Sequence, residues 1–255
     1  MNVKELYSAL DAMWGSSLSA EWDNDGLMCA SDVERPVTRA VVALDATITA
    51  IRRAEKTGSV LITHHPMIFR GAKTVVAGDA IPDRIIEAVR SGVAVMSFHT
   101  RLDAADGGVN DALAERVGIS VVSKFGDDES PTLGRIGTLG DPVTLEEFAR
   151  LVKGALGAPF VRFTGDGMKT VSEIAVVGGS GGDFIDAARR AGADVLLTGE
   201  VGYNRAEDGA ETGKIAVVEA GHYHTEAPVL PVMAKVVGSL GIETELFEYY
   251  PQRII

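Results

Sequence analysis

Short apolar runs alternate along the chain with longer stretches in which apolar residues recur every three or four positions. The short runs predict buried strands, and the longer stretches predict amphipathic helices. Strands that alternate with helices form βαβ units, so this pattern indicates an α/β fold with mostly parallel sheets. In the first part of the chain the predicted order is strand, helix, strand, helix and strand, at Ala40–Leu44, Ala50–Thr57, Val60–Thr63, Ile81–Ser91 and Val93–Phe98.

The same order returns later in the chain. Glu173–Val177 is a predicted strand, Asp183–Ala191 a helix, and Asp194–Thr198 and Ile215–Val218 are further strands. Residues 37–65 can be laid over 172–200, about 135 positions apart, and 93–100 over 215–225. Any two βαβ units share such patterning, so chance similarity is the alternative. We favour two lobes of similar build.

A stretch rich in Gly, Pro, Asp and Ser interrupts the periodicity at Lys124–Pro142, and it predicts the link between the lobes. The first lobe is then expected to comprise 1–125 and a C-terminal return, 228–255, and the second to comprise 126–227. Three further elements are an N-terminal helix in 1–15, a helix at Thr144–Leu156 with a Thr144/Glu147 capping box, and a last strand at 243–250.

Composition narrows the class of protein. Apolar residues make up 46% and charged residues 24%, as in ordinary soluble proteins. No apolar run reaches the roughly 18 residues of a membrane span, and the N-terminus lacks a signal-peptide core, so we expect a cytoplasmic protein with no membrane partner. The net charge of -12 makes nucleic acid an unfavourable partner. The single cysteine, Cys29, fits a reducing compartment, and a small buried residue is favoured over a reactive thiol.

The five histidines are grouped by their places relative to the predicted strands. Each lies at or just beyond the carboxyl end of an apolar strand, which is the edge where ligands bind in open α/β sheets. Scattered surface histidines would not be expected to group in this way. They are His64, His65, His99, His222 and His224.

The motif VLITHHPMIF (60–69) carries two of them. Adjacent residues on an extended backbone point in opposite directions, so His64 and His65 suit two neighbouring metal ions better than one. Packing or hydrogen bonding is the alternative.

In SFHTRLDAADGGVND (97–111), the Asp103 carboxylate can bind divalent ions. Capping of the next helix by Asp103 or Asp106 is the alternative. His99 could be a ligand, a hydrogen-bonding neighbour of the ligands or a proton shuttle, and we favour the neighbour.

The motif VVEAGHYHTEAPVL (217–230) places His222 and Glu226 four residues apart, on one face of a helix. An ordinary surface pair is the alternative, and His224 lies off that face. Mixed nitrogen and oxygen ligands suit zinc, manganese, iron, cobalt or nickel.

Two glycine-containing stretches leave alternatives open. GGSGG (178–182) could cradle a phosphate or could form only a tight turn. TGEVGY (198–203) aligns with the THHPM segment in the repeat, so Glu200 is a candidate acid/base group or a cap. EWDNDGL (21–27) could bring polar groups to the same site, or could only form a turn.

These motifs, THHPMIF, FHTRLDAADGGVND, GADVLLTGEVGY and EAGHYHTE after WDNDGL, closely resemble the GTP cyclohydrolase 1 type 2, or Nif-three-like, family. The resemblance implies a two-lobed α/β fold with a dinuclear centre in the cleft between the lobes, two divalent cations per subunit, and a homo-oligomeric ring, commonly a hexamer. It implies that Glu226 bridges the ions and that His99 lies nearby. The implied metal ligands are His64, His65, Asp103, His222 and Glu226.

The sequence departs from the family pattern at a few positions. Asp25 stands where the family commonly has Val, Glu200 where it has Asp, and Tyr203–Asn204 where it has Tyr-His. The last departure weakens the expectation of a catalytic histidine there.

The leading functional hypothesis is a dinuclear metal-dependent hydrolase, with His99 and Glu200 as candidate proton-transfer groups. The resemblance implies opening of GTP at the purine C8 with release of formate, or hydrolysis of a related nucleotide or phosphorylated small molecule. The alternative is a non-enzymatic ring that binds or handles metal in a regulatory role.

Overall fold

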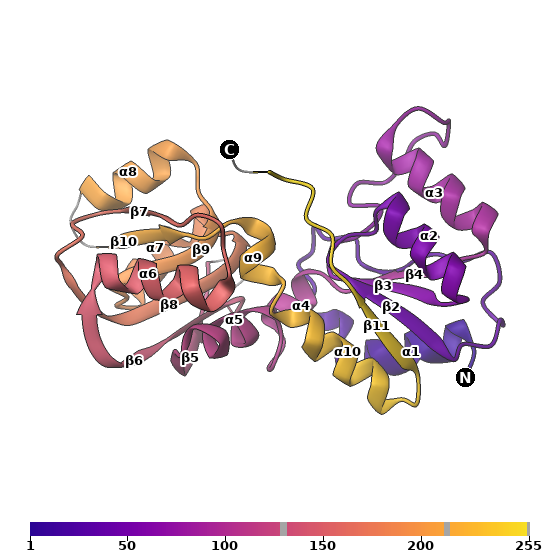
Figure 1. Ribbon diagram of the computed structural model, residues 1–255, viewed down its shortest axis with the longest axis horizontal. Helices are drawn as coiled ribbons and strands as arrows, with labels where there is room; N and C mark the ends of the chain where they lie inside the picture. Colours follow the sequence, from indigo (N-terminus) through magenta and orange to yellow (C-terminus); the bar gives the residue numbers. More distant parts are fainter. Residues whose placement is uncertain (128–131, 212–214, 254–255) are drawn as a thin grey trace. The chain divides into compact units, whose positions relative to one another are not determined.

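The computed structural model describes residues 1–127, 132–211 and 215–253. The chain divides into two compact units, and each is built on one of the two sheets in Figure 1. The first unit comprises Met1–Leu102 and Leu230–Pro251, and the second comprises chiefly Asp103–Val229.

The sheet of the first unit has the strand order β1-β4-β3-β2-β11. Four of its strands are parallel, and β1 pairs antiparallel with β4 at one edge. The sheet is therefore mostly parallel, as the sequence predicts. Its strands are β1 (Gly26–Cys29), β2 (Arg39–Ala43), β3 (Val60–Thr63), β4 (Val95–Ser97) and β11 (Glu243–Phe247). The helices of this part of the chain are α1 (Val3–Met13), η1 (Ser16–Leu18), α2 (Ile48–Thr57), α3 (Ala80–Ser91), α4 (Thr100–Ala104) and α10 (Val229–Ser239).

Helices cover both faces of this sheet. Val41, Leu61 and Val95 share a core cluster with residues of α2 and α3, while Figure 1 shows α1 and α10 on the opposite side. The alternating residues Val42 and Ile62 are also fully buried. The strands are apolar on both faces because both faces are covered, which explains their continuous apolar runs.

The sheet of the second unit has the order β5-β6-β8-β9-β10-β7. Only β8, β9 and β10 are parallel to one another; β5, β6 and β7 pair antiparallel. The expectation of a mostly parallel sheet is wrong for this unit, because β5 and β6, which are consecutive in the sequence, pair antiparallel. Its strands are β5 (Ser120–Phe125), β6 (Gly134–Thr144), β7 (Arg162–Thr164), β8 (Thr170–Ser180), β9 (Val195–Glu200) and β10 (Ala216–Glu219).

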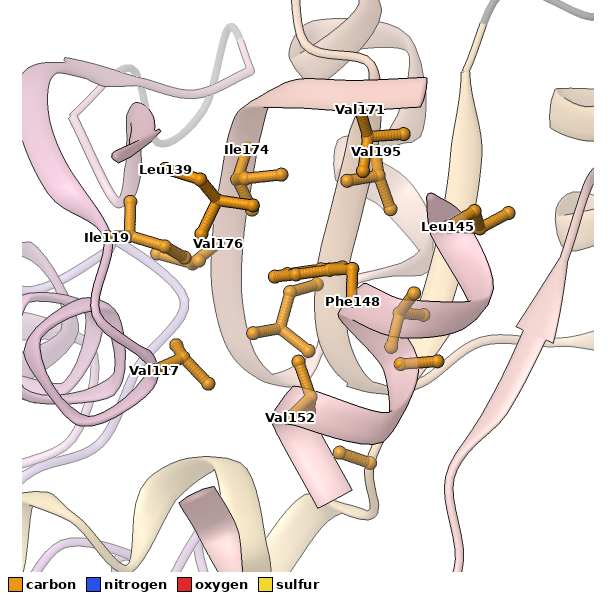
Figure 2. Packing of buried hydrophobic residues seen from close by; sticks show 14 of the residues in the cluster. Val117, Ile119, Leu139, Leu145, Phe148, Val152, Val171, Ile174, Val176 and Val195 are labelled. Carbon is orange, nitrogen blue, oxygen red and sulfur yellow. The ribbon is translucent and has the colours of Figure 1, made fainter. Parts of the chain in front are cut away.

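The core of the second unit lies on both sides of this sheet. Figure 2 shows Phe148 of α6 against Ile174 and Val176 of β8, in a cluster that also includes residues of α5. The alternating residues Ala175 and Val177 pack instead with α7 and α8. The helices of this unit are α5 (Val109–Val117), α6 (Leu145–Leu156), η2 (Gly182–Phe184), α7 (Ile185–Arg190), α8 (Tyr203–Glu211) and α9 (His222–Glu226).

The two sheets repeat one arrangement of strands. β2, β3 and β4 are neighbours in sequence order and parallel, and so are β8, β9 and β10. In each sheet the strand before this set, β1 or β7, pairs antiparallel with its third member. This topology agrees with the internal repeat inferred from the sequence.

The segment expected to link the lobes is largely strand, so that prediction is wrong. Lys124 lies in β5 and Gly134–Thr144 is β6, while residues 128–131 lie outside the described part. Glycines occur here because strands approach closely: a Cβ on Gly134 would lie 2.5 Å from the Phe125 ring. The units divide after Leu102 and after Val229, whereas the sequence placed the boundaries after 125 and 227.

The predicted capping box is confirmed. The Thr144 hydroxyl accepts a hydrogen bond from the Glu147 backbone N–H, and the Glu147 carboxylate accepts one from Thr144. Cys29 is half-buried and packs against the core of the first unit, in keeping with a structural role. Among the residues that the structure describes, no helix is both long and apolar enough to span a lipid bilayer.

Replacing Phe148 by Ala should destabilise the second unit by about 3–5 kcal/mol, because the ring is fully buried between α6 and β8. Leu151→Ala on the same helix is the control, since Leu151 is 40% exposed and its loss should cost less than about 1 kcal/mol. Urea unfolding followed by circular dichroism measures both. Equal losses would contradict this account of the core.

Candidate metal centre

His64 follows β3 directly and is fully buried. Its Nδ1 lies 3.0 Å from the backbone carbonyl oxygen of Phe98, just beyond β4. A carbonyl oxygen can only accept a hydrogen bond, so Nδ1 carries the proton. The lone pair of His64 is therefore on Nε2, the atom available to a metal ion.

His65 and His99 are held at Nδ1 by carboxylates. The Nδ1 of His65 lies 2.9 Å from Asp45, which follows β2, and the Nδ1 of His99 lies 2.9 Å from Asp23, which precedes β1. The two Nδ1–H groups donate, so that the lone pair of each ring, when the ring is neutral, is on Nε2. Carboxylates in this position fix the ring orientation and increase the basicity of the other nitrogen.

Asp23 is an unusually strong acid in this fold. Burial raises the pKa of its carboxyl group, but the hydrogen bond and charge of His99, together with two hydrogen bonds from Thr100, outweigh burial and lower the pKa to about 2. The Asp23 side chain is fully buried. It therefore remains ionised at neutral pH and holds the Nδ1–H of His99.

The three histidines of the first unit converge. The ring centroids of His64 and His65 are 5.0 Å apart, those of His64 and His99 are 5.3 Å apart, and those of His65 and His99 are 5.8 Å apart. One potential ligand atom from each lies within 4.8 Å of the others. The sequence favoured His99 as a neighbour of the ligands, and the structure places it as close to His64 and His65 as a ligand would be.

In the second unit, His222 and Glu226 lie on one face of α9, which begins shortly after β10. His222 Nε2 is 3.1 Å from Glu226 Oε1. The Glu226 side chain is only 5% exposed, so the alternative of an ordinary surface pair is wrong. A buried carboxylate beside an imidazole nitrogen is the arrangement that a divalent cation stabilises.

Glu200, at the end of β9, accepts a hydrogen bond from His222 Nδ1 at 2.9 Å. The hydrogen bond with His222 is the largest influence on Glu200 and lowers its pKa, with a smaller contribution from Ser180. Glu200 thus orients His222 and stays ionised. The sequence analysis gave Glu200 as a candidate acid/base group or a cap, and neither interpretation predicts its hydrogen bond with His222.

The GGSGG stretch is explained by the close approach of α9. A Cβ on Gly179 would overlap Glu226 Oε1 and lie 3.0 Å from His222 Nε2, and Gly179 has a φ of +67°. A Cβ on Gly199 would lie 2.7 Å from the Cα of His222. These glycines let the helix pack onto the ends of β8 and β9, so a phosphate cradle is not needed to account for them.

Asp103 lies on α4 and is 8% exposed. Its backbone carbonyl accepts a hydrogen bond from Asn110, whose side-chain oxygen accepts the N–H of Gly178. Asn110 therefore ties Asp103 to the stretch that supports Glu226. The capping alternative is wrong, because the N-cap of α5 is Gly108, with no side-chain cap, and Asp106 pairs with Lys124.

Asp25, one of the departures from the family pattern, has a defined role. It makes two hydrogen bonds with Arg101, at 2.5 and 2.9 Å, and Arg101 also bonds Asp11 of α1. This buried ion-pair network anchors the 21–27 loop beside His99.

The sequence analysis did not predict the roles of Asp45, Asn110 and the Asp25–Arg101 pair. Asp45 carries one signal that could have identified it, because it follows a predicted strand, as the histidines do.

Fold and site together define a two-unit α/β protein whose strand ends gather histidines and carboxylates. The sequence model of the Duf34/NIF3 (NGG1p interacting factor 3) family matches residues 1–250, and the chain belongs to this family. A Clostridium perfringens protein named GTP cyclohydrolase 1 type 2 homolog is 33% identical, covering 96% of this chain and 95% of that protein. The family resemblance read from the motifs is thereby confirmed.

Solved structures agree with the fold. A hypothetical protein from Staphylococcus aureus superposes with a TM-score of 0.91 at 25% identity, over 100% of this chain and 99% of that one. Reduced HcgD from Methanocaldococcus jannaschii superposes with a TM-score of 0.82 at 27% identity, over 98% of each chain.

Substituting Gly179 by Ala should destabilise the second unit through overlap with Glu226. Gly157→Ala is the matched control, because Gly157 has a similar φ of +60° and nothing within 4 Å of a built Cβ. The control should lose about 1 kcal/mol from backbone strain alone. Gly179→Ala should lose a further 1–3 kcal/mol or so in overpacking. Unfolding free energies measure the difference, and equal values would rule out the steric role.

Proposed function

We propose that this protein is a hydrolase that depends on two divalent metal cations, held by His64, His65, Asp103, His222 and Glu226. One observation carries the proposal. The three histidines of the proposed ligand set, His64, His65 and His222, each hold a fixed acceptor at Nδ1, so that Nε2 carries the lone pair of the neutral ring, which is the pattern of histidines that ligate metals.

The proposed ligands are drawn from both units. The first unit would supply the imidazoles of His64 and His65, and the second would supply the Asp103 carboxylate, the His222 imidazole and the Glu226 carboxylate. Glu226, whose carboxylate is nearly buried, would help to hold the ions. This mixture of nitrogen and oxygen suits zinc, manganese, iron, cobalt or nickel.

GTP or a related nucleotide is the proposed substrate, since relatives at up to 33% identity are named GTP cyclohydrolase 1 type 2 homolog. The proposed reaction opens the purine at C8 and releases formate. Divalent cations at this site would supply Lewis acidity, which polarises the substrate and makes water more acidic.

Proton transfer is assigned to His99. Asp23 holds its Nδ1–H, so Nε2 is the atom that can accept a proton. The imidazolium that results would be stabilised by the ionised Asp23, whose pKa is about 2. Glu200 is assigned the positioning of His222.

We extend the proposal to a cytoplasmic ring of identical subunits, commonly six in this family. Analytical ultracentrifugation measures the size of this assembly.

Metal analysis of protein purified without added metal tests the site. Wild type should carry about two equivalents of metal, and His222→Ala and Glu226→Gln should each lose most of it, because each removes a ligand atom. His224→Ala is the control, since His224 is on the same helix but off the His222/Glu226 face. Unchanged metal in all three variants would contradict the assignment.

Activity separates the enzyme from the alternative of a metal-binding ring. Metallated wild type should release formate from GTP or a related nucleotide, and Glu226→Gln should not. Full metal content with no turnover of any nucleotide in a broad screen would overturn the hydrolase proposal and leave the metal site standing.

Removing the acceptor of a site histidine should weaken metal binding without removing a ligand. Asp45→Ala is expected to lower metal affinity by about 10–100-fold, because His65 loses the group that fixes its ring. Asp45→Asn should retain most of the affinity, since its amide oxygen still accepts the Nδ1–H. Competition with a chromogenic chelator measures both. Equal affinities for wild type and Asp45→Ala would show that Asp45 plays no such role.

A further inference from the structure

Two large aromatic side chains lie exposed beside the histidine cluster of the first unit. Trp22, in the loop before β1, is 53% exposed, and Phe69, after the His64–His65 pair, is 41% exposed. Their ring centroids are 6.0 Å apart at 73°. Two exposed rings in contact with each other offer flat faces on which a planar ligand ring can stack.

His99 is the third ring of this group. It lies 6.3 Å from Trp22 at 75° and 5.9 Å from Phe69 at 89°. The three rings are thus nearly perpendicular to one another. Three rings have six faces, and each of the three edge-to-face contacts covers one face of one ring at most. These contacts therefore leave at least three faces uncovered. We call Trp22, Phe69 and His99 the aromatic corner. Trp22 and Phe69 offer flat apolar faces in it, and both are in contact with His99, the proposed proton-transfer residue.

The aromatic corner is held rigidly. The Asn24 side-chain amide donates a hydrogen bond to the carbonyl oxygen of Ile68, which ties the Trp22 loop to the segment that carries Phe69. Asp23, next to Trp22, accepts hydrogen bonds from His99 and Thr100. Rigid rings in a fixed position bind a flat ligand with little loss of entropy.

The exposed area indicates a small occupant. Two half-exposed aromatic side chains offer on the order of 200 Å². A stable protein interface buries about 800 Å² on each partner, roughly four times as much. A single bicyclic or similar planar ring matches the available area better than another protein does.

The residues after Phe69 favour an anionic ligand. Arg70 and Lys73 are both exposed, and no acidic residue occurs between Phe69 and Asp79. This local positive charge contrasts with the net charge of -12 for the chain. It would attract the phosphate groups of a ligand whose ring reaches the aromatic corner.

We infer that the planar heteroaromatic ring of a small anionic substrate, with the chemistry of a nucleotide base and its phosphate, stacks on Trp22 and meets Phe69 edge to face. This inference deepens the proposed function and rests on it for the reaction, but not for the binding. It assigns recognition of the ring to this corner and leaves the metal ligands unchanged.

Intrinsic fluorescence provides a direct test, because the chain has two tryptophans and Trp14 is buried. Guanosine, GTP, ribose 5-phosphate and inorganic tripolyphosphate are titrated into wild type and Trp22→Phe. We expect saturable quenching of wild type by guanosine and GTP but not by the two probes without a base. Trp22→Phe, whose remaining emission comes from Trp14, should show none of this quenching.

Calorimetry on the same samples measures affinity. Trp22→Ala should bind GTP about 5–150-fold more weakly, the range expected from loss of one base-stacking ring, and Phe69→Ala, which loses an edge-to-face contact, about 2–10-fold more weakly. Arg70→Glu should weaken GTP binding but not guanosine binding. Metal content measured in parallel should match wild type in all three variants.

Four results would overturn the inference. The first is no quenching of fully metallated wild type, the second is unchanged GTP affinity in both alanine variants, and the third is quenching by tripolyphosphate as strong as that by GTP. The fourth is a Trp22 emission protected from acrylamide in the assembled protein, which would show that another copy covers the corner. A wild type that binds no metal yet is quenched by guanosine would refute the proposed function alone.

Discussion

The proton on Nδ1 of each site histidine is the constraint on which the candidate centre depends. In His64, His65, His99 and His222 that proton is donated to an acceptor at 2.9–3.0 Å, and in the neutral ring the lone pair is then on Nε2. Three of the acceptors lie at or just beyond the carboxyl end of a strand, and the fourth, Asp23, lies three residues before the first residue of β1, Gly26. Because the strands are fixed by cores on both faces of each sheet, the tautomers and ring directions follow from the packing of the whole unit.

The internal repeat explains how two units come to offer related chemistry. In each sheet the site residues follow the second and third of three parallel strands: His65 and His99 after β3 and β4, Glu200 and His222 at or after β9 and β10. The units differ in the residue type found at the end of the second of these three strands. The first unit has histidines there and draws carboxylate acceptors from elsewhere, whereas the second has Glu200, which is itself the acceptor for His222.

The sequence predicted those features that depend on local pattern. Val60–Thr63 has the bounds of β3, because the strand is a continuous apolar run that ends at a polar pair. The grouping of histidines followed from their positions relative to such runs. The acceptors could not be predicted in the same way: Asp45 lies 20 residues from His65, and Asp23 lies 76 residues from His99. Only the folded sheets bring these groups together.

Glycine-rich segments show the same limit from the other direction. Gly134 belongs to a segment with the composition of a linker, and Gly179 belongs to one with the composition of a phosphate-binding loop. Each of them lies where a second element packs too closely for a Cβ. The sequence shows where glycine occurs, but only the tertiary contacts show why a side chain is excluded there. The boundary expected after residue 125 failed for this reason, since glycine in β6 reflects strand packing and not flexibility.

Successive residues of one loop carry the proposed ring-stacking side chain and the carboxylate that holds the proposed proton-transfer group. Trp22 is exposed, whereas the side chain of Asp23 is fully buried against His99. The backbone that presents the indole therefore also holds the carboxylate that fixes His99. Two contacts that follow in the same loop hold it in place: Asn24 bonds Ile68, and Asp25 is anchored by Arg101. A ring stacked on Trp22 cannot move the loop without disturbing the Asp23–His99 hydrogen bond, so the rigidity that orients the histidine also limits the positions open to a ligand.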